Sequence, residues 1–231
     1  MKMQGSSPAF SLYSKGNVMK IIKTCKIIVL CMIILCTTLF VPMQAQAAFN
    51  KEKAKKNVSV TYKKLSDGVL AIYKNKNKEA LKLSATMSFR DGDKKSISKE
   101  KQVNLCLGGK STAAFFFPAP RDEYGNIINY SSYKGSYSVA KSKYTNRSKK
   151  VNISSELDVI EGRFTAINLS GKTLSNIHIT VVFYDDNGEI LGCSTKYLSC
   201  YEKNAMEQFS IGYVGQMYQP SKVKIYVDWA Y

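Results

Sequence analysis

The chain has 231 residues, 45% of them hydrophobic and 22% charged, which is the composition of a folded globular protein and excludes a disordered one. The formal net charge of +17 favours partners that carry negative charge. With one histidine in the chain, a zinc motif of two histidines on one helix is excluded, and hydrolysis by a nucleophile with a histidine base is not expected.

The first 47 residues have the pattern of a secretory signal. Lys20, Lys23 and Lys26 precede an apolar run over 27–41, and Ala45-Gln46-Ala47 supplies small residues where signal peptidase cleaves. The apolar run has 15 residues, fewer than the ~20 that a membrane-spanning helix needs. The pattern therefore predicts a signal helix at the start of an exported protein.

The boundaries of this segment leave alternatives. The mature protein is expected to begin at Ala48, so that residues 1–47 form the signal peptide. Met19 is a second candidate start, in which case residues 1–18 are an upstream extension. The alternative to a cleaved signal is an uncleaved N-terminal anchor, and only then is contact with a membrane expected.

The cysteines give no disulfide framework. The part of the chain after the signal keeps Cys106, Cys193 and Cys200, and an odd number cannot pair completely. On one extended strand, the seven steps of ~3.3 Å between Cys193 and Cys200 exceed bonding distance. A bridge between them requires a turn, so we expect free and mostly buried thiols.

Two stretches share a pattern of strands. Gly68 and Gly162 each begin an apolar segment, and 21 residues after each glycine comes a phenylalanine, Phe89 or Phe183, that ends an alternating strand. Apolar residues alternate with polar ones before both phenylalanines, and acidic turns with glycine follow, as in hairpins. This spacing predicts an internal repeat.

The repeat predicts an all-β fold. Short strands joined by polar turns, in two units of this size, are typical of tandem immunoglobulin-like β-sandwich domains. We expect a first, basic sandwich over 57–144, a linker over 145–155 that is rich in Lys, Ser and Asn, and a second sandwich over 156–231.

The second unit resembles the bacterial FxLYD-type domains. Val181-Val182-Phe183-Tyr184-Asp185 stands at the position of the F-x-L-Y-D motif, with two of its four specified positions changed, and Asn187-Gly188 follows. Met87-Ser88-Phe89-Arg90-Asp91 in the first unit departs further. The resemblance implies an extracytoplasmic immunoglobulin-like module and no catalytic residue.

Charge is divided unequally between the two units. Residues 48–154 contain 23 Lys and Arg against 8 Asp and Glu, a balance of +15, whereas residues 155–231 contain 6 against 9, a balance of −3. A positive field on one unit concentrates polyanions there. Solubility is the alternative reason for such an excess.

One loop of the first unit is the candidate ligand site. It runs over 121–134 and has basic and aromatic residues among Gly, Asn and Ser: Arg121, Tyr124, Tyr130, Tyr133 and Lys134. Tyrosine rings stack on sugars and basic groups pair with phosphates. The alternative interpretation is a solvated connection whose tyrosines cover the edge of the sandwich.

Other motifs are interpreted as structural. Gly108-Gly109-Lys110-Ser111-Thr112 lacks a following helix and is predicted to be a turn, not a phosphate loop. The acidic residues over 185–189 lack calcium-loop spacing. His178 falls among the outward positions of a strand, where we expect a surface side chain. No catalytic residue, metal site or cofactor is predicted.

These observations predict a secreted or cell-surface, extracytoplasmic and non-enzymatic binding module. Its basic first domain is expected to associate with an anionic cell-wall polymer. The alternative is a structural or regulatory partner of another exported protein, bound through sheet edges or an apolar patch. Nucleic acid is not expected as a partner of an exported chain.

Overall fold

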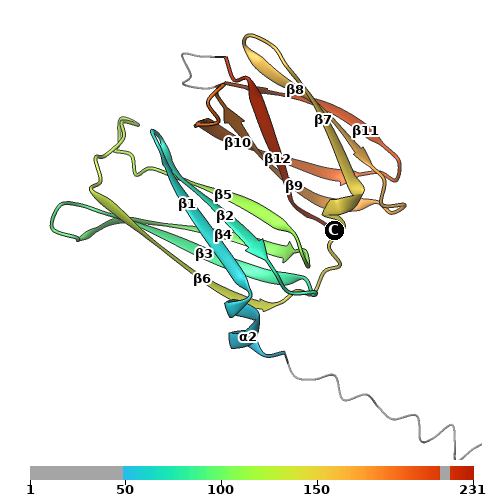
Figure 1. The fold of residues 1–231 in the computed structure, drawn as a ribbon, viewed down its shortest axis with the longest axis horizontal. Helices are drawn as coiled ribbons and strands as arrows, with labels where there is room; N and C mark the ends of the chain where they lie inside the picture. The colour runs from blue at the N-terminus through green and yellow to red at the C-terminus, as the bar shows by residue number, and fades with distance from the viewer. Residues whose placement is uncertain (1–48, 214–218) are drawn as a thin grey trace, which may run out of the picture. The chain divides into compact units, whose positions relative to one another are not determined.

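The computed structural model describes residues 49–213 and 219–231, so the predicted signal helix lies outside the described residues. The described chain is all-β, as predicted, with one short α-helix, α2 (Lys51–Lys56), and a 3₁₀ turn, η1 (Ser148–Lys150) (Figure 1). The strands are β1 (Val58–Leu65), β2 (Gly68–Asn75), β3 (Leu81–Arg90), β4 (Ser96–Leu107), β5 (Thr112–Pro118), β6 (Ser132–Lys141), β7 (Val151–Leu157), β8 (Glu161–Asn168), β9 (Leu174–Tyr184), β10 (Ile190–Tyr201), β11 (Met206–Gly212) and β12 (Lys222–Ala230).

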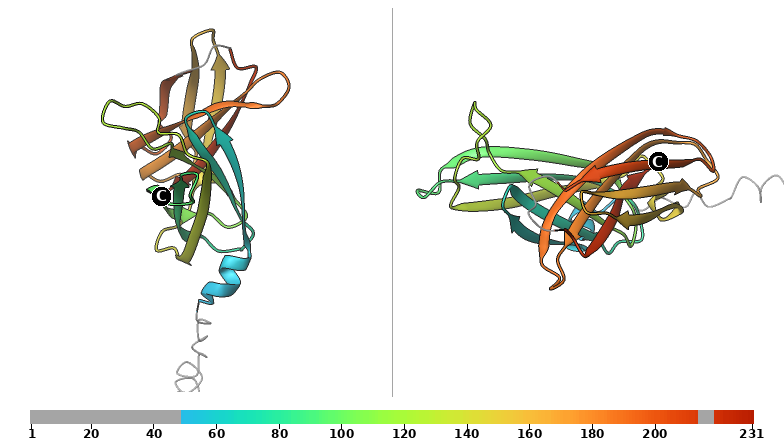
Figure 2. Two further views of the ribbon diagram at one scale, coloured as in Figure 1. Left: turned by 90° about the vertical axis from the view of Figure 1, so that its left-hand side faces the viewer. Right: turned by 90° about the horizontal axis from the view of Figure 1, so that it is seen from above.

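The strands form four antiparallel sheets of three strands each. Sheets β1-β2-β5 and β4-β3-β6 share one hydrophobic core and are called here the N-terminal sheet pair. Sheets β11-β8-β7 and β10-β9-β12 share a second core and are called the C-terminal sheet pair (Figure 2). Each strand of the first pair occupies the same place in its sheet as the strand six further along the chain. The arrangement is consistent with β-sandwiches.

Alternating side chains build both cores. In β3 every second residue from Leu81 to Phe89 has no exposed surface, while the residues between them reach the surface partly or fully. Phe89 and Phe183 are both buried, as expected from their matched spacing. In an antiparallel sheet with one face on a core, this period of two is what separates apolar from polar side chains.

A third apolar cluster joins the two pairs. Leu70 and Ala114, from the outer face of sheet β1-β2-β5, lie with Val182 and Tyr226 from the outer face of sheet β10-β9-β12. Strand β9 is consequently buried on both faces from Ile177 to Phe183. Residues 49–231 therefore form one compact unit, in which the two sheet pairs share a buried junction.

Two boundaries differ from the sequence prediction. Helix α2 precedes the expected first sandwich; Asn50 caps it by accepting a hydrogen bond from the Lys53 backbone N–H at 2.9 Å, and Ala54 is buried in the first core. The predicted linker over 145–155 is wrong at its C-terminal end because β7 begins at Val151. Val151 is buried in the second core and Ile153 packs against it; two apolar residues among Asn and Ser gave too short an alternation to indicate a strand.

Within residues 49–213 and 219–231, none of the helices has the length and apolar character required to cross a bilayer. Cys106 and Cys193 are free thiols, Cys106 buried and Cys193 half-buried. Burial raises the pKa of the Cys193 thiol to about 12, with a smaller contribution from nearby Asp67.

Candidate functional site

The tip of the predicted binding loop is a self-contained turn. The Asp122 carboxylate accepts hydrogen bonds from the backbone N–H groups of Tyr124 (3.0 Å) and Asn126 (2.8 Å). Arg121 donates from Nη1 to the carbonyl oxygen of Gly125 at 2.6 Å. Tyr124 is 82% exposed. Part of the hydrogen-bonding capacity of Arg121 is thus used within the loop itself.

The other predicted site residues lie apart from this tip. Tyr130 packs edge-on against Phe89, with ring centroids 4.8 Å apart, and Lys64 lies over its ring at 4.7 Å. Tyr133 is half-buried against the first core, and Lys134 is exposed on β6. Both tyrosines therefore cover the edge of the N-terminal sheet pair, which is the alternative interpretation of the loop. The structure does not gather the five residues into one site.

The prediction that His178 is a surface side chain is wrong. Alternation places it correctly on the face of β9 that points away from the second core, but that face meets the N-terminal sheet pair. His178 is 5% exposed, its ring stacks on Trp229 at 4.3 Å, and its Nδ1 lies 2.7 Å from Asp228 Oδ2. The imidazole is therefore part of a buried polar junction.

Asp228 is the centre of that junction. Its Oδ1 accepts a hydrogen bond from the Ala114 backbone N–H at 2.5 Å, and the Thr180 hydroxyl lies 2.6 Å from Oδ2. Asn104 donates to the Asp228 carbonyl oxygen at 2.9 Å. Burial raises the pKa of the Asp228 carboxyl, and the hydrogen bonds from His178 and the other partners oppose that shift. Ala114 and Asn104 belong to the N-terminal sheet pair, so the carboxylate joins both halves.

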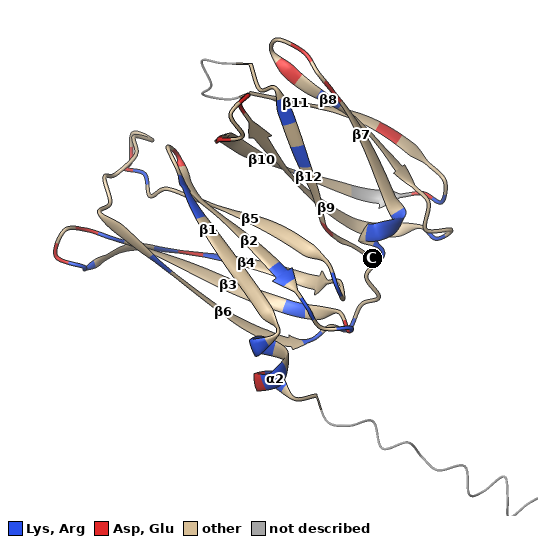
Figure 3. Cartoon of the chain, viewed as in Figure 1, with Lys and Arg blue, Asp and Glu red and all other residues tan. Residues whose placement is uncertain are grey.

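Cations are concentrated at one end of the N-terminal sheet pair. This basic end consists of α2, the connections β2–β3 and β4–β5, and the segment from the last residue of β6 to the end of η1. It carries Lys51, Lys53, Lys55, Lys56, Lys76, Lys78, Lys110, Lys141, Lys143, Arg147, Lys149 and Lys150 against Glu52 and Glu79, a balance of +10 (Figure 3). All twelve are exposed except Arg147, which is half-buried.

The opposite end is nearly balanced. This far end consists of the β1–β2 turn, the β3–β4 turn, the β5–β6 loop and the adjoining strand ends. It carries Lys63, Lys64, Arg90, Lys94, Lys95, Arg121 and Lys134 against Asp67, Asp91, Asp93, Asp122 and Glu123, a balance of +2. Lys134 and Lys141 lie near opposite ends of β6, seven steps of ~3.3 Å apart. The predicted binding loop is therefore at the end with less charge.

Hydrogen bonds hold the segments of the basic end together. Asn77 in the β2–β3 connection donates from Nδ2 to the Ala54 carbonyl oxygen of α2 at 3.0 Å, and its own carbonyl oxygen accepts from the Lys110 N–H at 3.0 Å. Lys149 Nζ donates to the Gly109 carbonyl oxygen at 3.3 Å. Helix, loop, turn and connection thus form one continuous surface.

A hollow of about 500 Å³ lies in this surface; it is called here the basic groove. Its charged lining residues are Lys78, Lys141, Arg147, Lys149, Lys150 and Glu79. In the described part of the chain, no ion pair joins one of these cations to a carboxylate; the ion pairs found there involve Arg163 and His178. Glu79 offsets only one of the five positive charges, so the groove keeps a net positive charge.

The walls of the groove are fixed by backbone and amide contacts. Asn146 accepts from the Ser148 N–H at 2.9 Å and the Ser148 hydroxyl at 2.7 Å, and its amide donates to the Cys106 carbonyl oxygen. A Cβ at Gly109 would lie 1.9 Å from the Lys78 carbonyl oxygen, so only glycine allows this approach. The hollow is preformed, which lowers the ordering cost of binding.

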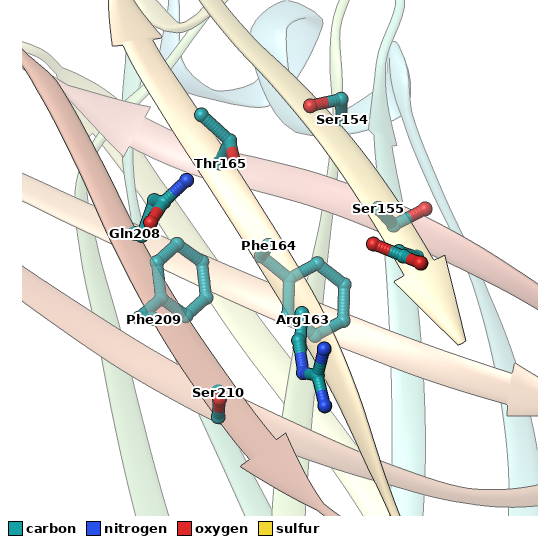
Figure 4. Close-up of a pocket in the computed structure, with 9 residues that line it drawn as sticks. Ser154, Ser155, Arg163, Phe164, Thr165, Gln208, Phe209 and Ser210 are labelled. Atoms are coloured by element: carbon teal, nitrogen blue, oxygen red, sulfur yellow. The ribbon is translucent and has the colours of Figure 1, made fainter. Parts of the chain in front are cut away.

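A second hollow, of about 700 Å³, lies on sheet β11-β8-β7 of the C-terminal sheet pair. Figure 4 shows Ser154, Thr165 and Ser210 around it, with Arg163 at one side. The Arg163 guanidinium is already paired with Asp158 at 2.8 Å and with Glu161 at 3.4 Å. This hollow is hydroxyl-rich and has no free positive charge, so it does not suit a polyanion.

No group of three or more His, Cys, Asp or Glu side chains within 49–213 and 219–231 is arranged to hold a metal ion. No family model and no curated protein matches the chain. A crystal structure of red sea bream transglutaminase aligns with 81% of this chain and 32% of its own, at 9% identity and a TM-score of 0.26. The chain spans about a third of that structure. The resemblance to FxLYD-type domains stays a prediction.

Proposed function

We propose that the protein is an exported, non-enzymatic binding module whose basic end associates with an anionic cell-envelope polymer. The observation that supports this is the unequal distribution of cations, with a balance of +10 at one end of the N-terminal sheet pair and +2 at the other. A concentrated positive surface attracts a polyanion over a Debye length and releases counterions on contact. If the same lysines were distributed evenly over the surface, they would give only a diffuse attraction.

We propose that the two sheet pairs are tandem immunoglobulin-like β-sandwiches of FxLYD type and that they lie on the outside of the cell. The shared sheet order of the two halves supports this assignment. The C-terminal sheet pair serves as a rigid partner of the first, because Asp228, Thr180 and their partners join the two halves. The binding surface then lies on the first half and on the connection to the second.

The test is capture of the protein on the envelope of its own cells at low and high salt. We expect capture at low salt and release at high salt. A variant with Lys51, Lys53, Lys149 and Lys150 changed to Gln should lose most of the binding. A control with Lys63, Lys95, Arg121 and Lys134 changed to Gln removes the same charge from the far end and should retain it. Equal loss in both variants, or none in either, contradicts the proposal.

A second candidate function is that of a structural or regulatory partner of another exported protein. The β7–β8 turn presents Val159 and Ile160, which are 70% and 79% exposed. Two adjacent exposed aliphatic side chains at a turn favour an apolar contact. Co-purification of a single protein that persists at high salt and is lost on changing Val159 and Ile160 to Ser would support this function instead.

A further inference from the structure

We propose that the basic groove binds a phosphate monoester group of the polymer and holds it between the N-terminal sheet pair and the entry to the C-terminal sheet pair. This inference rests on the proposed function and adds the chemistry of the ligand and the position of its subsite. Three observations support it. The cations of the groove come from both halves of the molecule, there are five of them, and hydrogen bonds fix the backbone around them.

The cations of the groove come from both halves of the molecule. Lys78 and Lys141 belong to the N-terminal sheet pair. Arg147 and Lys150 are tied to the other half, because the Arg147 N–H donates to the Ala230 carbonyl oxygen and the Lys150 carbonyl oxygen accepts from the Leu169 N–H, both at 2.8 Å. An anion in the groove therefore contacts both sides at once.

One side chain already crosses the groove. Lys149 lies on η1, and its ammonium donates to the carbonyl oxygen of Gly109 in the β4–β5 turn at 3.3 Å. The bond is long for a charged donor, so an anion that enters the groove competes well for that ammonium. Lys149 can then turn toward the ligand without losing a strong contact.

The number of cations favours phosphate over carboxylate. Five cationic side chains face one hollow of about 500 Å³ with Glu79 as the only acid among the lining residues. A phosphate monoester offers three charged acceptor oxygens, more than the two of a carboxylate, and an arginine fork binds two of them side by side. A sugar carboxylate would leave more of these cations without a partner.

The experiment compares two polymers on the full-length protein: dextran carrying phosphate monoester groups and polygalacturonate, matched for charge. The groove variant is Lys149→Gln with Lys150→Gln, and the matched variant is Lys51→Gln with Lys53→Gln on α2. We expect the unchanged protein to bind the phosphate polymer about tenfold more tightly, a difference of ~1.4 kcal/mol. The groove variant should lose that preference, and the α2 variant should weaken both polymers alike and keep it.

The outcomes separate the inference from the proposed function. Equal affinity for the two polymers, or the same loss of preference in both variants, overturns the phosphate site while leaving the basic end as a polyanion surface. Binding to neither polymer nor to the native envelope overturns the proposed function. Tighter binding to phosphatidic acid vesicles than to the polymer, lost in the groove variant, overturns the polymer as the source of the phosphate. Displacement of the polymer by equimolar inorganic phosphate also overturns the polymer as the source, because the free ion would then bind as well as the polymer does.

Discussion

The two sheet pairs have the same strand order, but their net charges have opposite signs. In both, a central strand lies between two neighbours in each sheet, and matched phenylalanines, Phe89 and Phe183, are buried. Yet residues 48–154 carry a balance of +15 and residues 155–231 a balance of −3. The inward positions that make the fold are alike in kind, whereas the charge lies on turns and connections, where substitutions leave the core unchanged. One architecture thus carries a strongly basic surface in one half and a slightly acidic balance in the other.

The junction between the two pairs is more polar than the core of either pair. Their own cores are apolar, but the junction between them contains Asp228, His178 and Thr180. A buried carboxylate is expensive unless its partners are all in place. The hydrogen bonds of the junction are therefore satisfied in one relative placement of the two pairs. That placement also fixes the distance between the two walls of the basic groove.

The largest expected effect is the loss of Asp228. Asp228→Ala leaves the Ala114 N–H and the ring of His178 buried without their acceptor, and should lower the free energy of unfolding by ~3–5 kcal/mol. Asp228→Asn keeps an acceptor for the N–H and should cost less. Urea denaturation followed by fluorescence measures both, because Trp229, the single tryptophan, stacks on His178 in this junction. A cost of less than ~1 kcal/mol for the alanine variant would show that the junction contributes little.

The two matched phenylalanines test whether the pairs unfold together. Phe89→Ala and Phe183→Ala should each lower the free energy of unfolding by ~3–5 kcal/mol, because each leaves a cavity in a core. Since Trp229 also contacts the first core, one transition should be seen by tryptophan fluorescence and by circular dichroism in both variants. Two separated transitions, with only one moved by each substitution, contradict a shared unit.

The sequence predicted the strands better than it predicted their surroundings. Alternation over 81–90 and 177–183 placed every inward side chain, because a strand with one face on a core shows that face in its own residues. Burial of His178 was missed because it depends on a partner sheet. The available signal was a line of apolar residues on outward faces, Leu70 and Ala114 in one half and Val182 in the other.

The candidate site was predicted only as a charge imbalance. Lys78 is far along the chain from Lys141 and Lys150, and they come together because the connections meet at one end of the sheets. The loop over 121–134 has the more suggestive composition, but Tyr130 and Tyr133 pack on the core edge. Composition locates basic residues along the chain, whereas turn geometry decides which of them share a surface.

A smaller effect concerns pH. Burial raises the pKa of Asp228, so the folded chain holds that proton more tightly than the unfolded chain. Its contribution to the free energy of unfolding is therefore fully present below the unfolded pKa of ~3.9 and declines as the pH rises through the folded value. The difference between the unchanged protein and Asp228→Asn should follow this decline in urea titrations from pH 3 to pH 8. A difference that grows with pH has the wrong sign for this account.

The smallest effect is on thiol reactivity. At neutral pH very little of Cys193 is thiolate, since its pKa is raised to about 12, and Cys106 is buried in the first core. Both should resist iodoacetamide in the folded protein, because only the thiolate attacks. In Asp228→Ala both should react faster and by similar factors, as measured by mass spectrometry of their peptides. Acceleration at Cys193 alone would mean that the junction opens while the N-terminal sheet pair stays folded.

The central claim, that the basic end carries the binding, is tested most directly by the salt dependence of envelope binding. The slope of the logarithm of the binding constant against the logarithm of salt concentration counts the anionic contacts that release counterions. The variant with Lys51, Lys53, Lys149 and Lys150 changed to Gln should bind more weakly and with a distinctly shallower slope than the unchanged protein. The far-end variant with Lys63, Lys95, Arg121 and Lys134 changed to Gln should keep the original slope. A slope that falls equally in both variants would mean that total charge, and not the basic end, drives the association.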